Sequence, residues 1–186
     1  MNSKELAHIM HGDVATHSTF KGVFRADTFL EFIPQYPTSI IVNTENHDHP
    51  GKHWVAIYIT AQGNAEFFYS YGHPPQYYHK AWLDWLKHYS NSLKYSRHAI
   101  QPIYSATCGL HCLFYLYHRN HDITLEMIQE MYTTSKPLND QLAEEDLESH
   151  TLMDIIIDDS DLLINQLCTA LYPAPPNYLP ATSTTS

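Results

Sequence analysis

Residues 108–119 read Cys-Gly-Leu-His-Cys-Leu-Phe-Tyr-Leu-Tyr-His-Arg, a long apolar run with few helix breakers. Such a run is typical of a helix buried in a core. Three segments before it are short, apolar and rich in β-branched or aromatic residues, which indicates strands: Ser39–Thr44, His53–Thr60 and Ala65–Tyr71. We therefore expect an α+β fold, in which a mixed sheet packs on a central helix that begins at Cys108.

The remaining segments surround this core. The turn chemistry of Gln62-Gly63-Asn64 favours a hairpin between two of the strands. Ser3 and Thr124 are expected to cap short helices. Helices are predicted at 4–10, 76–88, 124–132 and within 140–171, a further strand at 95–103, and a loop-rich stretch at 12–36. We expect one domain over 1–172 and a disordered Pro/Ser/Thr-rich tail over 173–186.

Composition excludes several classes of protein. The 186 residues are 44% hydrophobic and only 16% charged, which is typical of a globular chain. A formal net charge of -10 argues against a general nucleic-acid binder. Three cysteines are too few for a disulfide scaffold and favour a reducing compartment. No apolar run reaches membrane-spanning length, and no secretory signal is recognised at the N-terminus.

His53 and Cys108 are the pair that could carry chemistry. Cys108 opens the predicted buried helix, where the helix dipole and unpaired N–H groups should lower the pKa of a thiol. A histidine beside it could form an ion pair and protonate a leaving amine. The amide of Gln101 could help to hold an oxyanion, and Gly109 would leave room for a substrate backbone. With fourteen histidines and three cysteines, however, accidental pairs are common, and the plain alternative is a buried thiol and a strand-end histidine.

Three local sequences in one order make the interpretation more specific. Residues 41–44 and 51–54 (Ile-Val-Asn-Thr, then Gly-Lys-His-Trp) resemble the catalytic-histidine region of the adenovirus-type maturation proteases, the adenain family. Residues 67–72 (Phe-Phe-Tyr-Ser-Tyr-Gly) resemble the strand that supplies that family's acidic residue. Residues 100–101 and 105–112 resemble its oxyanion glutamine and nucleophile segment. The resemblance covers roughly 41–116, with a looser fit at 20–24, and leaves the C-terminal third unmatched.

The resemblance implies a cysteine endopeptidase with a papain-like site in permuted chain order. Cys108 would be the nucleophile and His53 the general base and acid. Gln101, with the backbone N–H of Cys108, would form the oxyanion hole. Members of the family cleave capsid and core precursors at small-residue sites, often containing glycine, during virion maturation. The protein would then act in the virion and in a reducing compartment of the infected cell. Relatives also occur in virophages and virus-like DNA transposons.

Tyr69 departs from the pattern, because the family has Asp or Glu at this position. A tyrosine hydroxyl could accept a hydrogen bond from the imidazole of His53 but supplies no full charge. Thiolate–imidazolium pairs tolerate a neutral orienting group, so we expect reduced dependence on a third residue. Glu66 should point to the opposite face of the strand, since its separation from Tyr69 is odd. Asp48, in the preceding loop, is another candidate orienter.

The sequence argues against the cofactors of the adenain family and against a metal, and it suggests one protein partner. The family's peptide and DNA cofactors are not expected here, because no cysteine lies within 76–103 to tether the peptide and the net charge is acidic. Cys108, His111 and Cys112 have a spacing that could bind a metal, but no second ligand pair accompanies them, so we expect none. In the tail, 175–178 (Pro-Pro-Asn-Tyr) matches the pattern of segments that dock in WW-domain grooves.

Two other functions stay open on this evidence. The ubiquitin-like-protein proteases share the order of motifs, so an isopeptidase for such modifiers is one alternative. A degenerate protease that serves as a binding module is the other, and Tyr69 is the residue that favours it.

Overall fold

The computed structural model describes residues 1–45 and 53–150 and contains a five-stranded mixed sheet. The strands lie in the sheet in chain order: β1 (Phe20–Phe24), β2 (Thr38–Asn43), β3 (Trp54–Ile59), β4 (Asn64–Phe68) and β5 (Ser92–Tyr95). β2, β3 and β4 are antiparallel, whereas β1 and β5 pair in parallel with their neighbours. The predicted α+β class is confirmed.

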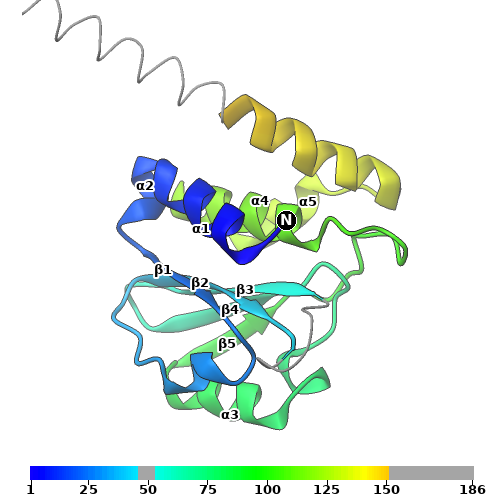
Figure 1. Cartoon of the computed structure of the whole chain (residues 1–186). Helices are drawn as coiled ribbons and strands as arrows, with labels where there is room; N and C mark the ends of the chain where they lie inside the picture. Colours follow the sequence, from blue (N-terminus) through cyan, green and yellow to red (C-terminus); the bar gives the residue numbers. More distant parts are fainter. Residues whose placement is uncertain (46–52, 151–186) are drawn as a thin grey trace, which may run out of the picture. The chain divides into compact units, whose positions relative to one another are not determined.

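Helices cover both faces of the sheet (Figure 1). On one face lie α1 (Ser3–Gly12), α4 (Cys108–Asn120) and α5 (Leu125–Met131), followed by a helix over 136–150. The short α2 (Val14–His17) joins α1 to β1. On the other face lie α3 (Lys80–His88) and the 3-10 turns η1 (Thr28–Glu31) and η2 (Pro75–Tyr77). Because both faces are covered, every residue of β2 is buried, which explains the apolar run over 40–42 at its centre.

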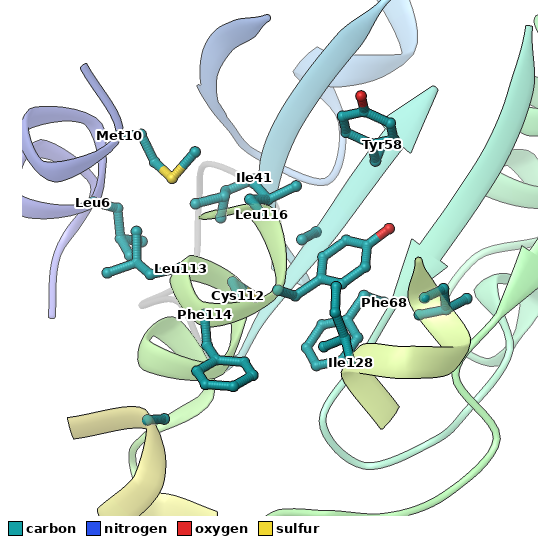
Figure 2. Close-up of a cluster of buried hydrophobic side chains, with 14 of the residues drawn as sticks. Leu6, Met10, Ile41, Tyr58, Phe68, Cys112, Leu113, Phe114, Leu116 and Ile128 are labelled. Atoms are coloured by element: carbon teal, nitrogen blue, oxygen red, sulfur yellow. The ribbon is translucent and has the colours of Figure 1, made fainter. Parts of the chain in front are cut away.

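The core between α4 and the sheet is built on the long apolar run. Figure 2 shows Leu6 and Met10 of α1 directed toward Leu113 of α4. Beneath them Phe68 and Tyr115 stack with ring centroids 4.5 Å apart. Nearly the whole of α4 is buried, and its first residue, Cys108, therefore has a fixed place against the sheet.

A second core fills the opposite face. Its centre is Trp82 of α3, which is fully buried and packs edge-on against Phe29 of η1. The indole N–H of Trp82 donates a hydrogen bond to the carbonyl of Ala26 at 3.2 Å. The aromatic spacing over 76–88 predicted a helix, and the structure divides this stretch into η2 and α3.

Two expectations about the strands were wrong. β1 lies in the stretch expected to be loop, because Lys21 and Gly22 hide the strand pattern and pairing with β2 creates it. The strand expected at 95–103 is instead β5, which ends at Tyr95. The hydroxyl of Ser96 bonds both the backbone N–H and the carbonyl of Tyr69, at 2.9 Å each, and the chain then leaves the sheet.

The helix caps were predicted with mixed success. α1 is capped by Asn2, not Ser3, since the Asn2 side chain accepts from the N–H groups of Lys4 and Glu5 in a capping box. α5 is capped by Thr124 as expected. The helix expected within 140–171 begins at 136, and its part beyond 150 lies outside the described residues. The boundary predicted at 172 and the tail motif at 175–178 also lie outside them. No helix in the described ranges is long and apolar enough to cross a bilayer.

Gly72 permits a close approach between the turn after β4 and the loop at 97–99. Its φ is +74°, and a Cβ there would lie 2.8 Å from the carbonyl carbon of His98. Backbone atoms cannot move aside cheaply, so we expect Gly72→Ala to lower the free energy of unfolding by about 1–3 kcal/mol, measured from urea midpoints. Gly63→Ala is the control, because Gly63 has φ +75° but meets the side chain of Asn91. Equal midpoints for the two variants would contradict the prediction.

Candidate active site

Cys108 lies where α4 meets the beginning of β3. It is 5% exposed, and burial raises the pKa of its thiol above the ordinary value. Hydrogen bonds from the backbone N–H groups of Trp54, Gly109 and Cys108 itself oppose this rise without cancelling it. The sequence predicted a lowered pKa from the helix terminus alone, and the net direction is the reverse because desolvation outweighs the three donors.

His53 immediately precedes β3, beside the residue that contacts the thiol. Its carbonyl accepts a hydrogen bond from the N–H of Thr44 at 2.9 Å, which anchors this end of the strand to β2. The imidazole meets the ring of Tyr71 edge-on, with centroids 5.2 Å apart. The residue after His53, Trp54, packs on the residue after Cys108, since a Cβ on Gly109 would lie 3.4 Å from the Trp54 side chain.

Tyr69 follows β4, and its ring lies near that of His53. The centroids of the two rings are 6.2 Å apart and their planes are steeply inclined. The hydroxyl of Tyr69, however, hydrogen-bonds the hydroxyl of Tyr78. Burial, followed by this hydrogen bond, raises the pKa of Tyr69 far above its ordinary value. Tyr69 is therefore a neutral aromatic neighbour of His53.

Glu66 and Asp48 are the two other residues that could orient the imidazole of His53. Glu66 points to the opposite face of β4, as predicted, where its carboxylate bonds Arg119 and Tyr115 in the core. It cannot reach His53 from there. Asp48 lies outside the described residues.

Gln101 is fully buried, and both ends of its amide are held. Its Oε1 accepts a hydrogen bond from the hydroxyl of Ser70 at 2.5 Å. Its Nε2 donates to the carbonyl of Ser105 at 2.9 Å, and its contact with Ser105 Oγ is longer, at 3.5 Å. Since one amide N–H bonds the carbonyl, the other N–H is the one that could serve a substrate oxyanion.

Ser70 is a residue of the site that sequence reasoning missed. Besides its hydroxyl contact with Gln101, its carbonyl accepts from the N–H groups of Ile100 and Gln101, at 2.8 and 3.3 Å. Tyr71 was missed too: its ring contacts His53, and its hydroxyl donates to the carbonyl of Pro102 at 3.3 Å. The one signal for Ser70 in the sequence was its place as a small polar residue between two tyrosines at the end of a strand.

Gly109 has a different role from the one expected. A Cβ on Gly109 would meet side-chain atoms of Leu6, Met1 and Trp54, each at 3.4 Å. These side chains occupy the space that the sequence suggested for a substrate backbone. The glycine therefore lets α1 and Trp54 pack closely on the start of α4.

Cys108, His111 and Cys112 of α4 do not converge on one point where a metal ion could bind. His111 turns away to Asp140, with Nε2 2.9 Å from Oδ1, and Cys112 is fully buried in apolar surroundings. Within 1–45 and 53–150, no group of three His, Cys, Asp or Glu side chains is placed to hold a metal ion.

Comparison with known proteins gives distant likenesses only. No protein-family model matches the chain, and no curated protein matches it by sequence. One similar solved structure is that of the Se-Met ASFV pS273R protease, with 22% identity and a TM-score of 0.40 over 60% of this chain. The match spans 44% of that protease, less than half its length. Another is the central domain of an uncharacterized protein, Lpg1148, from Legionella pneumophila. It has 14% identity and a TM-score of 0.46, over 83% of this chain and 97% of that one.

His111 should make the stability of the fold depend on pH. Burial lowers the pKa of His111, although the hydrogen bond to Asp140 opposes the shift. In the unfolded chain a histidine has a pKa of about 6.5, above the lowered pKa of His111 in the fold, so the unfolded state takes up the proton first as the pH falls. The stabilisation is therefore complete above that pH and declines below it. We expect the urea midpoint to fall between about pH 7.5 and about pH 5.5, and His111→Gln to reduce that fall.

The matched variant is His17→Gln, which replaces an exposed histidine. It should keep the dependence of the wild-type protein. If His111→Gln and His17→Gln declined in parallel, the pH dependence would have another source.

Proposed function

We propose that this chain is a cysteine endopeptidase, in which Cys108 is the nucleophile and His53 the general base and acid. The observation that carries the proposal is the packing of Trp54 on the first turn of α4, where a Cβ on Gly109 would lie 3.4 Å from the Trp54 side chain. Trp54 directly follows His53, and Gly109 directly follows Cys108. A thiol at the start of a helix and an imidazole at the start of the strand that packs on it are the two groups that a thiol protease needs.

The reaction would follow the usual two steps of acyl transfer. His53 takes the proton of the Cys108 thiol, and the thiolate attacks the scissile carbonyl. The amide of Gln101 and the backbone N–H of Cys108 would stabilise the oxyanion that develops. The tetrahedral intermediate then expels the amine, which receives its proton from His53. Water, activated by the same histidine, hydrolyses the thioester and restores the thiol.

Tyr69 would replace the acid in a purely steric role. Its hydroxyl is bonded to Tyr78 and its ring lies edge-on to His53, so it limits the rotation of the imidazole without adding charge. The imidazolium would then be stabilised chiefly by the thiolate itself. Loss of Tyr69 should therefore cost less activity than loss of an acidic orienter costs a serine protease.

The substrates that we propose are capsid or core precursor polypeptides of a virus or virus-like element, cut at small-residue, glycine-containing sites. Support for this class comes from the order of the three motifs in the sequence. The site of action would be the virion and a reducing compartment of the infected cell, and neither DNA nor a peptide cofactor would be needed.

A second candidate is a degenerate protease that acts as a binding module. Two observations favour it: burial raises the pKa of Cys108, and a neutral Tyr69 stands in the acid's place. An isopeptidase for ubiquitin-like modifiers is a third candidate function, because the proteases of such modifiers share the same order of motifs.

One set of measurements separates these functions. The full chain is incubated with a degenerate peptide library and, separately, with vinyl-sulfone derivatives of ubiquitin-like modifiers, and the products and modified cysteine are identified by mass spectrometry. An endopeptidase cuts peptides that contain small residues. An isopeptidase leaves the library uncut while the modifier labels Cys108. A chain that cuts nothing, and whose Cys108 reacts with iodoacetamide only above about pH 8, is a binding module.

A further inference from the structure

The loop that leads from Gln101 to Cys108 is held by the first turns of the helix over 136–150. Asn139 is fully buried, and its Nδ2 donates to the carbonyl of Ile100 at 3.0 Å. Asp140 follows it, and its Oδ1 accepts a hydrogen bond from the hydroxyl of Thr107 at 2.7 Å. Both ends of the loop are thus fixed by two successive residues of the chain's C-terminal third, the part that matches no family motif.

A chain of hydrogen bonds that passes through Ser105 connects Asp140 to the proposed oxyanion donor, Gln101. Thr107 gives its hydroxyl proton to Asp140, so the hydroxyl of Ser105, 2.5 Å away, donates to Thr107. The carbonyl of Ser105 accepts from Nε2 of Gln101 at 2.9 Å. Ser70 fixes the other end of the same amide. The orientation of the Gln101 amide therefore depends on an acceptor at Asp140.

The carboxylate of Asp140 is held in place by His111 of α4. His111 is fully buried, and its Nε2 lies 2.9 Å from Asp140 Oδ1, while its Nδ1 lies 3.3 Å from the hydroxyl of Tyr132. Burial lowers the pKa of His111, so the neutral ring donates from Nε2 and accepts at Nδ1. Burial alone would raise the pKa of Asp140, but its polar neighbours, which include the hydroxyl of Thr107 and the ring of His111, outweigh burial and lower the pKa. Asp140 is therefore a carboxylate with a fixed Oδ1.

We propose that Asp140 is a positioning residue for the oxyanion hole: it holds Thr107 and Ser105, and through them the amide of Gln101 and the N–H of Cys108. The inference rests on the proposed function, since it concerns the same site. Asp140 touches no reacting atom, and what it supplies is an acceptor, not a charge near the sulfur. This predicts that Asn can replace Asp140, because an amide Oδ1 can accept from both Thr107 and His111.

The test compares two reactions of Cys108 that differ in their need for an oxyanion hole. In p-nitrophenyl acetate, the thiolate attacks the carbonyl, an oxyanion forms, and p-nitrophenolate leaves as the thioester forms. With iodoacetamide, the thiolate displaces iodide and no oxyanion forms. We expect Asp140→Ala to slow acylation about 10- to 100-fold and to leave alkylation unchanged. Background from other cysteines is subtracted with Cys108→Ala.

Matched variants guard against a general loss of structure. Asp140→Asn should restore most of the acylation rate. Asp146→Ala is the control, because Asp146 lies on the same helix, is similarly buried and pairs with His118 at 3.2 Å, away from the loop. Thr107→Val removes the hydroxyl link and should act like Asp140→Ala, with no additional loss in the double variant. If Asp140→Ala fails to fold, Thr107→Val carries the test.

Four results would overturn the inference, and one of them would refute the proposed function as well. Equal loss in acylation and alkylation would place the effect on the thiol itself, and failure of Asp140→Asn to rescue would make the charge, not the acceptor, essential. A wild-type protein whose Cys108 is not acylated at all would refute the proposed function, and the inference with it. Acylation of wild type and Asp140→Ala at one rate would refute the inference alone.

Discussion

Cys108→Ala should lower the rate of peptide cleavage by a factor on the order of 10⁴ or more, the scale seen when a covalent nucleophile is removed. Alanine keeps the backbone at the start of α4 but has no atom that can attack a carbonyl. Initial cleavage rates on the peptide library measure the effect, and unchanged thermal melting shows that the fold persists.

Cys112→Ala is the matched control for this variant. Cys112 lies on the same helix and is fully buried among apolar side chains of α4 and its neighbours. Its loss leaves a small cavity and should reduce stability without a comparable loss of cleavage. Cleavage that survives in Cys108→Ala, or that is lost equally in both variants, would assign the reaction to another residue.

The largest effect on stability is expected at the ion pair between β4 and α4. Arg119 contacts Glu66 with both ends of its guanidinium, at 2.8 Å from Nε and 3.2 Å from Nη2, and each side chain is 10% exposed. Tyr115 donates to the same carboxylate at 2.8 Å. Arg119→Met would leave Glu66 buried without a counter-charge, and we expect the free energy of unfolding to fall by about 3–5 kcal/mol.

A double variant separates the buried charge from the packing. Glu66→Gln together with Arg119→Met removes both charges and keeps an acceptor for Tyr115, so it should recover most of the loss. Lys94→Met is the control, since the Lys94–Glu126 pair is 2.7 Å long but 61% and 56% exposed, and its urea midpoint should stay near that of the wild type. A double variant no more stable than Arg119→Met would contradict the explanation.

The elements that could be predicted from the sequence are those with a strong local pattern. β3 is an unbroken apolar run, α4 is a long and largely apolar one, and α5 has both a capping residue and an apolar face. β1 could not be predicted, because Lys21 and Gly22 interrupt its pattern and only pairing with β2 makes it a strand. The end of β5 depends on Ser96, whose hydroxyl bonds the backbone of Tyr69 far away in the chain.

In the candidate site, too, some features could be predicted from the sequence and others depend on the folded chain. His53 and Cys108 could be selected from the order of the motifs, and the structure adds that Trp54, next to His53, packs on Gly109, next to Cys108. The raised pKa of Cys108 could not be predicted, since it depends on burial by the folded chain. The partners of Gln101 were equally hidden, because Ser70 and Ser105 meet the amide only after the loop folds back on β4.

The short segment from Tyr69 to Gly72 serves both halves of the site at once. Tyr69 borders the imidazole, Ser70 anchors the amide of Gln101, and Gly72 lets the chain pass close to the loop that follows β5. A displacement of this one turn would therefore move the proposed base, His53, and the proposed oxyanion donor, Gln101, together. If the proposed function holds, substitutions in this turn should depress proton transfer and oxyanion stabilisation in proportion instead of uncoupling them.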